Sequence, residues 1–99
     1  MFIVLYRWRV KPESQQQFIE AWSEITNHFR ANYDSLGSRL HRGSDDLFYG
    51  YAQWTSAEQR ENVFAGENAE IRQASLKMRE AVEESFPEVV LEEIADYLV

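Results

Sequence analysis

Two residues of the sequence, Tyr6 and His28, have side chains that could take part in proton chemistry. Tyr6 lies in an apolar and aromatic segment, where a buried hydroxyl needs a hydrogen-bond partner and could orient a carbonyl or phenol of a ligand. His28 lies between Ile25 and Phe29 at the edge of an apolar stripe, where an imidazole could titrate near neutrality and act as a general base. Each has a plainer interpretation, in which Tyr6 is a core tyrosine and His28 a half-buried boundary histidine.

A second signal is the presence of small residues among aromatic ones. Gly50 interrupts an aromatic segment, and glycine within a strand often marks the close approach of another group. A cavity above such residues, walled by aromatic side chains, would suit a flat apolar ligand. Alternatively, the aromatic rings simply fill the space above them. The candidate ligand-binding residues are Trp8, Trp22, Gly50, Ala52, Trp54 and Met78.

Several kinds of site are excluded by the residue types. The sequence has no cysteine, so it can form neither disulfides nor thiolate sites. His28 and His41 lie on separate expected elements and make a poor metal site. Neither a glycine-rich phosphate loop nor a usable Ser-His-Asp set occurs. Arg72 could neutralise an enolate, although a solvated arginine is the simpler interpretation. Because the sequence has no cysteine and its two histidines lie on separate elements, we expect no metal site.

The charge and hydropathy of the chain bear on its partners. The 99 residues carry a net charge of −7, and residues 51–99 account for all of it, with four basic and eleven acidic residues. An acidic protein repels a phosphate backbone, so we expect no nucleic-acid partner. No apolar run approaches the roughly 18 residues of a membrane span. The apolar run 2–6 is also too short for the core of a signal peptide, so we expect a cytoplasmic protein with no membrane contact.

The hydropathy pattern predicts a β-α-β-β-α-β order with the second helix broken around Gly66-Glu67-Asn68. Strict alternation is typical of strands, and apolar residues at i, i+4, i+7 and i+11 are typical of an amphipathic helix. We predict one domain over residues 1–99, an α+β, ferredoxin-like fold with a four-stranded antiparallel sheet and helices on one face. The expected strands are 2–10, 38–42, 47–54 and 89–99, and the expected helices are 14–33, 57–64 and 68–86.

The two faces of the expected sheet differ in composition. The even-numbered residues of the first strand are all apolar or aromatic, so we assign them to the face that the helices cover. Tyrosine and arginine enrichment on the other face is typical of an interface, and the simplest account is a homodimer packed sheet against sheet. The alternative is a solvated face with snorkelling side chains. The residues expected on the open face are Leu5, Arg7, Arg9, Arg39, His41, Tyr49, Tyr51 and Tyr97.

The middle of the sequence, together with its opening strand, resembles a known family. Gly37-Ser38-Arg39-Leu40-His41-Arg42 precedes an acidic turn, and Phe48-Tyr49-Gly50-Tyr51-Ala52-Gln53-Trp54 then leads into Thr55-Ser56-Ala57-Glu58. With the opening strand that ends in Val10-Lys11-Pro12, this resembles the antibiotic biosynthesis monooxygenase (ABM) domain over almost the whole chain. The resemblance implies a dimeric α+β barrel, with a pocket in each subunit between sheet and helices.

The resemblance also implies a class of chemistry. The haem-degrading branch uses an asparagine on the first strand, where Tyr6 lies here, and a Trp and a haem-ligating His that residues 68–86 lack. The oxygenase branch deprotonates an electron-rich anthrone or quinol and holds the carbanion while oxygen attacks, without a bound cofactor. Tyr6, Trp54 and His28 could serve this chemistry. A non-catalytic dimeric binding or accessory domain is the alternative.

Overall fold

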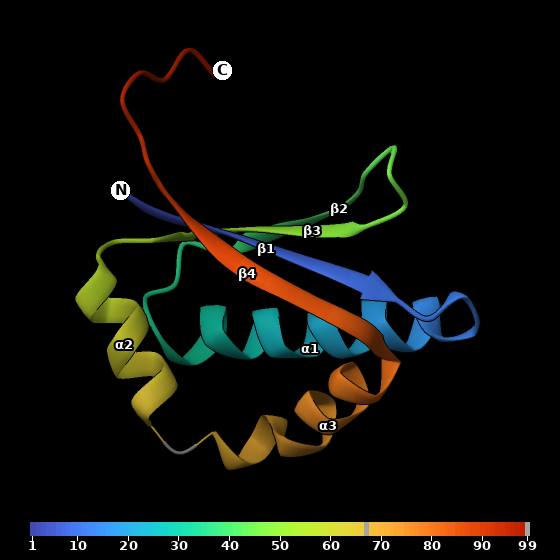
Figure 1. The fold of residues 1–99 in the computed structure, drawn as a ribbon. Helices are drawn as coiled ribbons and strands as arrows, with labels where there is room; N and C mark the ends of the chain where they lie inside the picture. The colour runs from blue at the N-terminus through green and yellow to red at the C-terminus, as the bar shows by residue number, and fades with distance from the viewer. Residues whose placement is uncertain (67, 99) are drawn as a thin grey trace.

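The computed structural model describes residues 1–66 and 68–98. They form a four-stranded antiparallel sheet with the helices on one side, as Figure 1 shows, so the predicted α+β, ferredoxin-like fold is confirmed. Short 3₁₀ turns precede the first and third helices. The elements are β1 (Phe2–Val10), α1 (Gln15–Asn32), β2 (Ser38–Arg42), β3 (Phe48–Trp54), α2 (Ala57–Ala65), α3 (Arg72–Ala81) and β4 (Val82–Glu92).

The strand order is β2-β3-β1-β4, so β1 and β3 are central and β2 and β4 are edges. Tyr6 of β1 lies opposite Gly50 of β3, and Arg7 lies opposite Tyr49. On the other side of β1, Arg7 pairs with Phe86. Directly paired residues share a sheet face, so these registers decide which side chains reach the helices.

The even-numbered face of β1 packs against the helices, as its alternation predicts. Val4 belongs to a buried cluster with Ala52, Trp54 and Val63, and Phe2 and Tyr6 pack against it. A second cluster comprises Val10, Phe18, Phe48 and Ala81, with Trp8, Trp22 and Met78 against it. Together the two clusters join the sheet to all three helices and define the layer in which a ligand could bind.

The helix starts differ from each other. At the start of α1, Ser14 makes no side-chain cap bond, and the side chain of Gln17 donates to the carbonyl of Lys77 at 2.8 Å. At the start of α2, the hydroxyl of Ser56 accepts a bond from the backbone N–H of Gln59 at 3.0 Å. None of the helices in the described residues is long and apolar enough to cross a membrane.

The prediction was wrong about where the last helix ends. It ends at Ala81, and Phe86 and Pro87 lie inside β4, which pairs with β1 from Val10↔Val82 to Phe2↔Glu92. Pro87 falls at an irregularity of the register on an edge strand, the kind of position at which a strand tolerates proline. Residues 93–98, expected in the last strand, have no regular structure, and Glu67 and Val99 lie outside the described residues.

Candidate functional site

A cavity of about 330 Å³ lies between the sheet and the helices. Its volume falls at the lower end of the range typical of small-molecule pockets, roughly 300–1,000 Å³. Its polar atoms are few and come from residues such as Tyr6, Asn68 and Ser75. The aromatic walls comprise Tyr6, Trp8, Trp22, Phe29, Trp54 and Phe64, contributed by β1, α1, β3 and α2. Such a lining suits a flat, largely apolar molecule.

The small residues of β3 lie under this cavity. Gly50 and Ala52 both line it, and Met78 of α3 lines the opposite side. A Cβ atom at Gly50 would lie 2.9 Å from two ring carbons of Trp8, closer than real contacts allow. The absence of a side chain at Gly50 therefore lets the Trp8 ring lie against the strand. Trp8 fills the space directly above Gly50, and the cavity remains beyond that ring.

All three tryptophans of the chain line the cavity. Trp8 is stacked on Tyr6, with ring centroids 5.7 Å apart and planes 9° from parallel. Trp54 is 3% exposed, and its indole Nε1 has no hydrogen-bond partner among the described residues. A buried N–H without an acceptor is costly, so it is a feature that a ligand oxygen could satisfy.

Tyr6 lies in a polar network that no sequence pattern revealed. The Nε of Arg60 donates to the Tyr6 hydroxyl oxygen at 3.1 Å, and the Arg60 Nη2 contacts the Oε2 of Glu88 at 2.5 Å. The guanidinium also lies over the rings of Tyr6 and Phe64, at 5.6 and 5.0 Å. Burial raises the pKa of Tyr6, although the Arg60 charge works in the opposite direction. Tyr6 is therefore protonated at neutral pH, and its oxygen accepts the bond from Arg60 while its own O–H can still donate.

His28 is the one predicted site residue that does not line the cavity. Its Nδ1 lies 3.4 Å from a carboxylate oxygen of Glu70 and 3.2 Å from the side-chain nitrogen of Asn32. Its ring is 6.3 Å from that of Tyr33. The structure therefore separates the two candidates for proton chemistry, because Tyr6 reaches the cavity and His28 faces this neighbouring cluster. Arg72, the enolate-neutralising candidate, is exposed.

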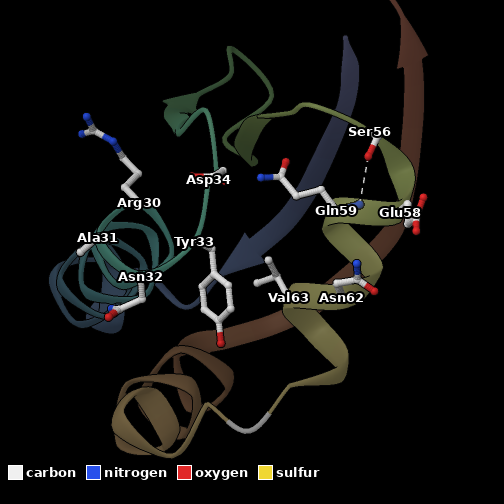
Figure 2. Close-up of a pocket in the computed structure, with 10 residues that line it drawn as sticks. All are labelled: Arg30, Ala31, Asn32, Tyr33, Asp34, Ser56, Glu58, Gln59, Asn62 and Val63. Atoms are coloured by element: carbon white, nitrogen blue, oxygen red, sulfur yellow. Dashed lines mark hydrogen bonds between the residues drawn. The ribbon is translucent and has the colours of Figure 1, made fainter.

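A second hollow, of about 570 Å³, lies between the end of α1 and α2 (Figure 2). Figure 2 shows Tyr33 and Val63 side by side at its centre, with the Arg30 side chain pointing away from them. It is larger than the aromatic cavity, but none of its buried polar side-chain atoms lacks a partner among the described residues. We therefore place the candidate site in the aromatic cavity, which combines apolar walls with unused polar groups.

The described residues contain no group of three or more His, Asp or Glu side chains placed to hold a metal ion. The lining of the aromatic cavity, within residues 1–66 and 68–98, also contains no carboxylate, imidazole, ammonium or guanidinium group. The chemistry available there thus comes from hydroxyl, indole and amide groups.

The open face of the sheet brings together most of the residues expected there. Arg39 pairs with Tyr51, and His41 with Tyr49, whose hydroxyl bonds Asp45 at 2.5 Å. Next to them, Arg7 lies 5.6 Å from the centroid of the Phe86 ring. Leu5 pairs with Tyr51 and Val89, and Arg9 forms an ion pair with Glu84 at 3.5 Å. Tyr97 lies beyond β4 and is 94% exposed, so it does not pack on this face.

Comparisons with known proteins agree with the observed fold. A family model described as "Antibiotic biosynthesis monooxygenase" matches residues 1–68. The fold is similar to that of a candidate antibiotic biosynthesis monooxygenase from Caulobacter crescentus CB15, with a TM-score of 0.79 and 14% identity over 95% of this chain and 90% of that one. A counterpart from Bordetella bronchiseptica has a TM-score of 0.78 and 14% identity, and the match covers 95% of this chain and 97% of that one. At these identities the likeness is one of fold, and no curated protein matches the chain.

Proposed function

The chain belongs to the antibiotic biosynthesis monooxygenase family, and from that premise we propose that it is an oxygenase of an aromatic, quinol-like or anthrone-like small molecule. In this proposal the reaction uses neither a metal nor a bound cofactor. The observation that supports it best is the cavity lined by three tryptophans and by Tyr6, whose hydroxyl can donate to a ligand oxygen.

The proposed reaction turns a ring methylene of the substrate into a carbonyl. An anthrone loses one proton to give an enolate, and O₂ bonds to the resulting carbanion carbon to give a hydroperoxide. Loss of water from that hydroperoxide breaks the O–O bond and leaves the carbonyl. One oxygen atom enters the product and the other leaves as water, so no external reductant is needed.

Tyr6 has a defined role in this scheme. Negative charge develops on the substrate oxygen as the carbon-bound proton leaves, and a preorganised donor there stabilises the enolate. The proton itself passes to solvent in this proposal, because no carboxylate or imidazole is present in the described lining. His28 would need to leave Glu70 to act as the base, so we assign the oxygen-binding role to Tyr6.

We further propose that the working form is a homodimer packed through the open sheet face. The exposed apolar side chains of Val89 and Leu91 share this face with Leu5 and Tyr51, and arginines flank them. Apolar, tyrosine and arginine side chains in one patch are typical of interfaces.

A second candidate function is that of a non-catalytic binding domain. The specific observation in its favour is the lack of any titratable base in the described lining of the cavity. The test is oxygen uptake with 1,8-dihydroxyanthrone, corrected for the uncatalysed rate. Uptake that depends on Tyr6 supports the oxygenase, whereas binding without uptake supports the binding domain.

A further inference from the structure

We propose that Arg60 is a positioning residue, which holds the Tyr6 hydroxyl as a hydrogen-bond donor to an oxygen atom of the ligand. This inference rests on the proposed function for the identity of the ligand class. The inference also adds a requirement to the proposed function: the ligand carries an acceptor oxygen, a carbonyl or an ionised phenol, at the Tyr6 side of the cavity.

The hydrogen bond between Arg60 and Tyr6 has only one possible direction. A guanidinium has only donors, so its Nε–H must donate to a lone pair of the Tyr6 oxygen, 3.1 Å away. The phenolic proton is not used in this bond. The positive charge of the guanidinium beside the oxygen repels the phenolic proton, which is therefore directed away from Arg60.

Arg60 is itself fixed in place. Its Nη2 contacts the Glu88 carboxylate, and the guanidinium lies over the rings of Tyr6 and Phe64. Its side chain is only 18% exposed, so the charge is largely removed from water. Charge-assisted bonds are about twice as strong as neutral ones, and a guanidinium with several partners loses most of its freedom.

Arg60 connects three elements of the fold. It lies on α2, while Tyr6 lies on β1 and Glu88 on β4, so its contacts link the helix to two strands. Arg60 does not line the cavity itself, and it touches two residues that do, Tyr6 and Phe64. Phe64 has no polar group, so an effect of Arg60 that depends on a ligand oxygen passes through Tyr6, which makes Arg60 a positioning residue and not a binding one.

The test uses two ligands that differ at one ring position. Anthrone carries a carbonyl, and 9,10-dihydroanthracene carries a methylene in its place. Both are titrated without oxygen, and binding is followed by the fluorescence of Trp8, Trp22 and Trp54, which all line the cavity. The quantity of interest is the ratio of the two dissociation constants. Relative to Tyr6→Phe, we expect the unchanged protein to favour anthrone by about three- to tenfold, the size of one net hydrogen bond.

The variants separate positioning from packing. Arg60→Met keeps an unbranched chain over Phe64 but removes the donor, and it should lower the anthrone preference as far as Tyr6→Phe does. The double variant should lower it no further. Arg60→Lys, which keeps a charged donor, should restore part of the preference. The matched control is Arg42→Met, because Arg42 also lies over an aromatic ring, that of Phe48 at 5.2 Å, but donates to Gln15 and not to Tyr6.

The inference is overturned if Arg60→Met keeps the full anthrone preference that Tyr6→Phe loses. If Arg60→Met does not fold, Glu88→Gln decides: a reduced preference supports the inference and an unchanged one overturns it. Oxygen uptake is measured separately. An intact, Arg60-dependent preference without uptake would reject the oxygenase and leave the role of Arg60 standing.

Discussion

The Nε of Arg60 lies 3.1 Å from the hydroxyl oxygen of Tyr6, although 54 residues separate them in the chain. This contact joins α2 to the central strand of the sheet at the wall of the aromatic cavity. It places a charged, largely buried group behind the one hydroxyl that the proposed chemistry uses.

Replacing Tyr6 by Phe should lower the rate of oxygen uptake with 1,8-dihydroxyanthrone by roughly tenfold to a hundredfold. Removing one donor to a developing oxyanion in other enzymes costs about 10²–10³ in rate, and partial access of solvent to this cavity reduces that figure. The measurement is oxygen consumption at saturating substrate. Tyr97→Phe is the control, because Tyr97 lies beyond β4 and is 94% exposed. An equal loss in both variants would contradict the role of Tyr6.

The stability of the protein should fall above about pH 10 in a manner that depends on Tyr6. Burial raises the pKa of Tyr6 in the folded state, so the unfolded chain loses this proton first as the pH rises. The stabilising contribution is thus complete below the unfolded pKa and is lost as the pH approaches the folded one.

Thermal unfolding between pH 8 and 11 tests this. The melting temperature of Tyr6→Phe should fall less steeply with pH than that of the unchanged protein. Tyr49→Phe is a necessary comparison, since the bond to Asp45 raises the pKa of Tyr49 as well. Parallel curves for Tyr6→Phe and the unchanged protein would contradict the burial of Tyr6.

Replacing Gly50 by Ala should destabilise the protein by about 1–3 kcal/mol and weaken ligand binding. The new Cβ would lie 2.9 Å from the Trp8 ring, which is packed against Tyr6 and Phe18 and has little freedom to move. Denaturant unfolding measures the loss. Gly66→Ala is the matched control, because its nearest neighbour would lie at 3.5 Å and its φ is −74°. Equal stabilities of the two variants would be the contradictory result.

Replacing Val89 by Asp should convert the proposed dimer to a monomer, whereas Val90→Asp should leave it intact. The two valines are neighbours on the edge strand β4 and are 39% and 55% exposed. Val89 pairs with Leu5 on the open face, and Val90 pairs with Val4 on the helix-covered face. A charge buried in an interface without a partner is costly. Sedimentation velocity gives the masses. Monomers of the unchanged protein and of both variants would reject the dimer.

The sequence predicted the sheet and most of the cavity because both depend on local periodicity. Alternation in residues 2–10 placed Tyr6 and Trp8 on the helix-covered face, and the small residue at Gly50 marked the close approach of Trp8. The end of the last helix was mistaken because Val82 and Phe86 have helical spacing. Pairing with the full length of β1 favours a strand there, and that pairing is a long-range effect.

The Arg60 network could not be predicted from the sequence. Its three members come from α2, β1 and β4, and nothing in their spacing indicates that they meet. The nearest local signal is Phe64, one helical turn after Arg60, over which the guanidinium lies. The orientation of His28 could not be predicted either. Its position at the edge of the apolar stripe allowed the ring to face either the cavity or the neighbouring surface, and in the structure it lies against Glu70.

The most direct test of the proposed oxygenase is the reaction of 1,8-dihydroxyanthrone under ¹⁸O₂, with the product analysed by mass spectrometry. The account predicts uptake well above the uncatalysed rate and a product that gains one labelled oxygen atom, with both effects diminished in Tyr6→Phe. Uptake no faster than in buffer, with the ligand bound in the cavity, would contradict the oxygenase and establish a binding domain in its place.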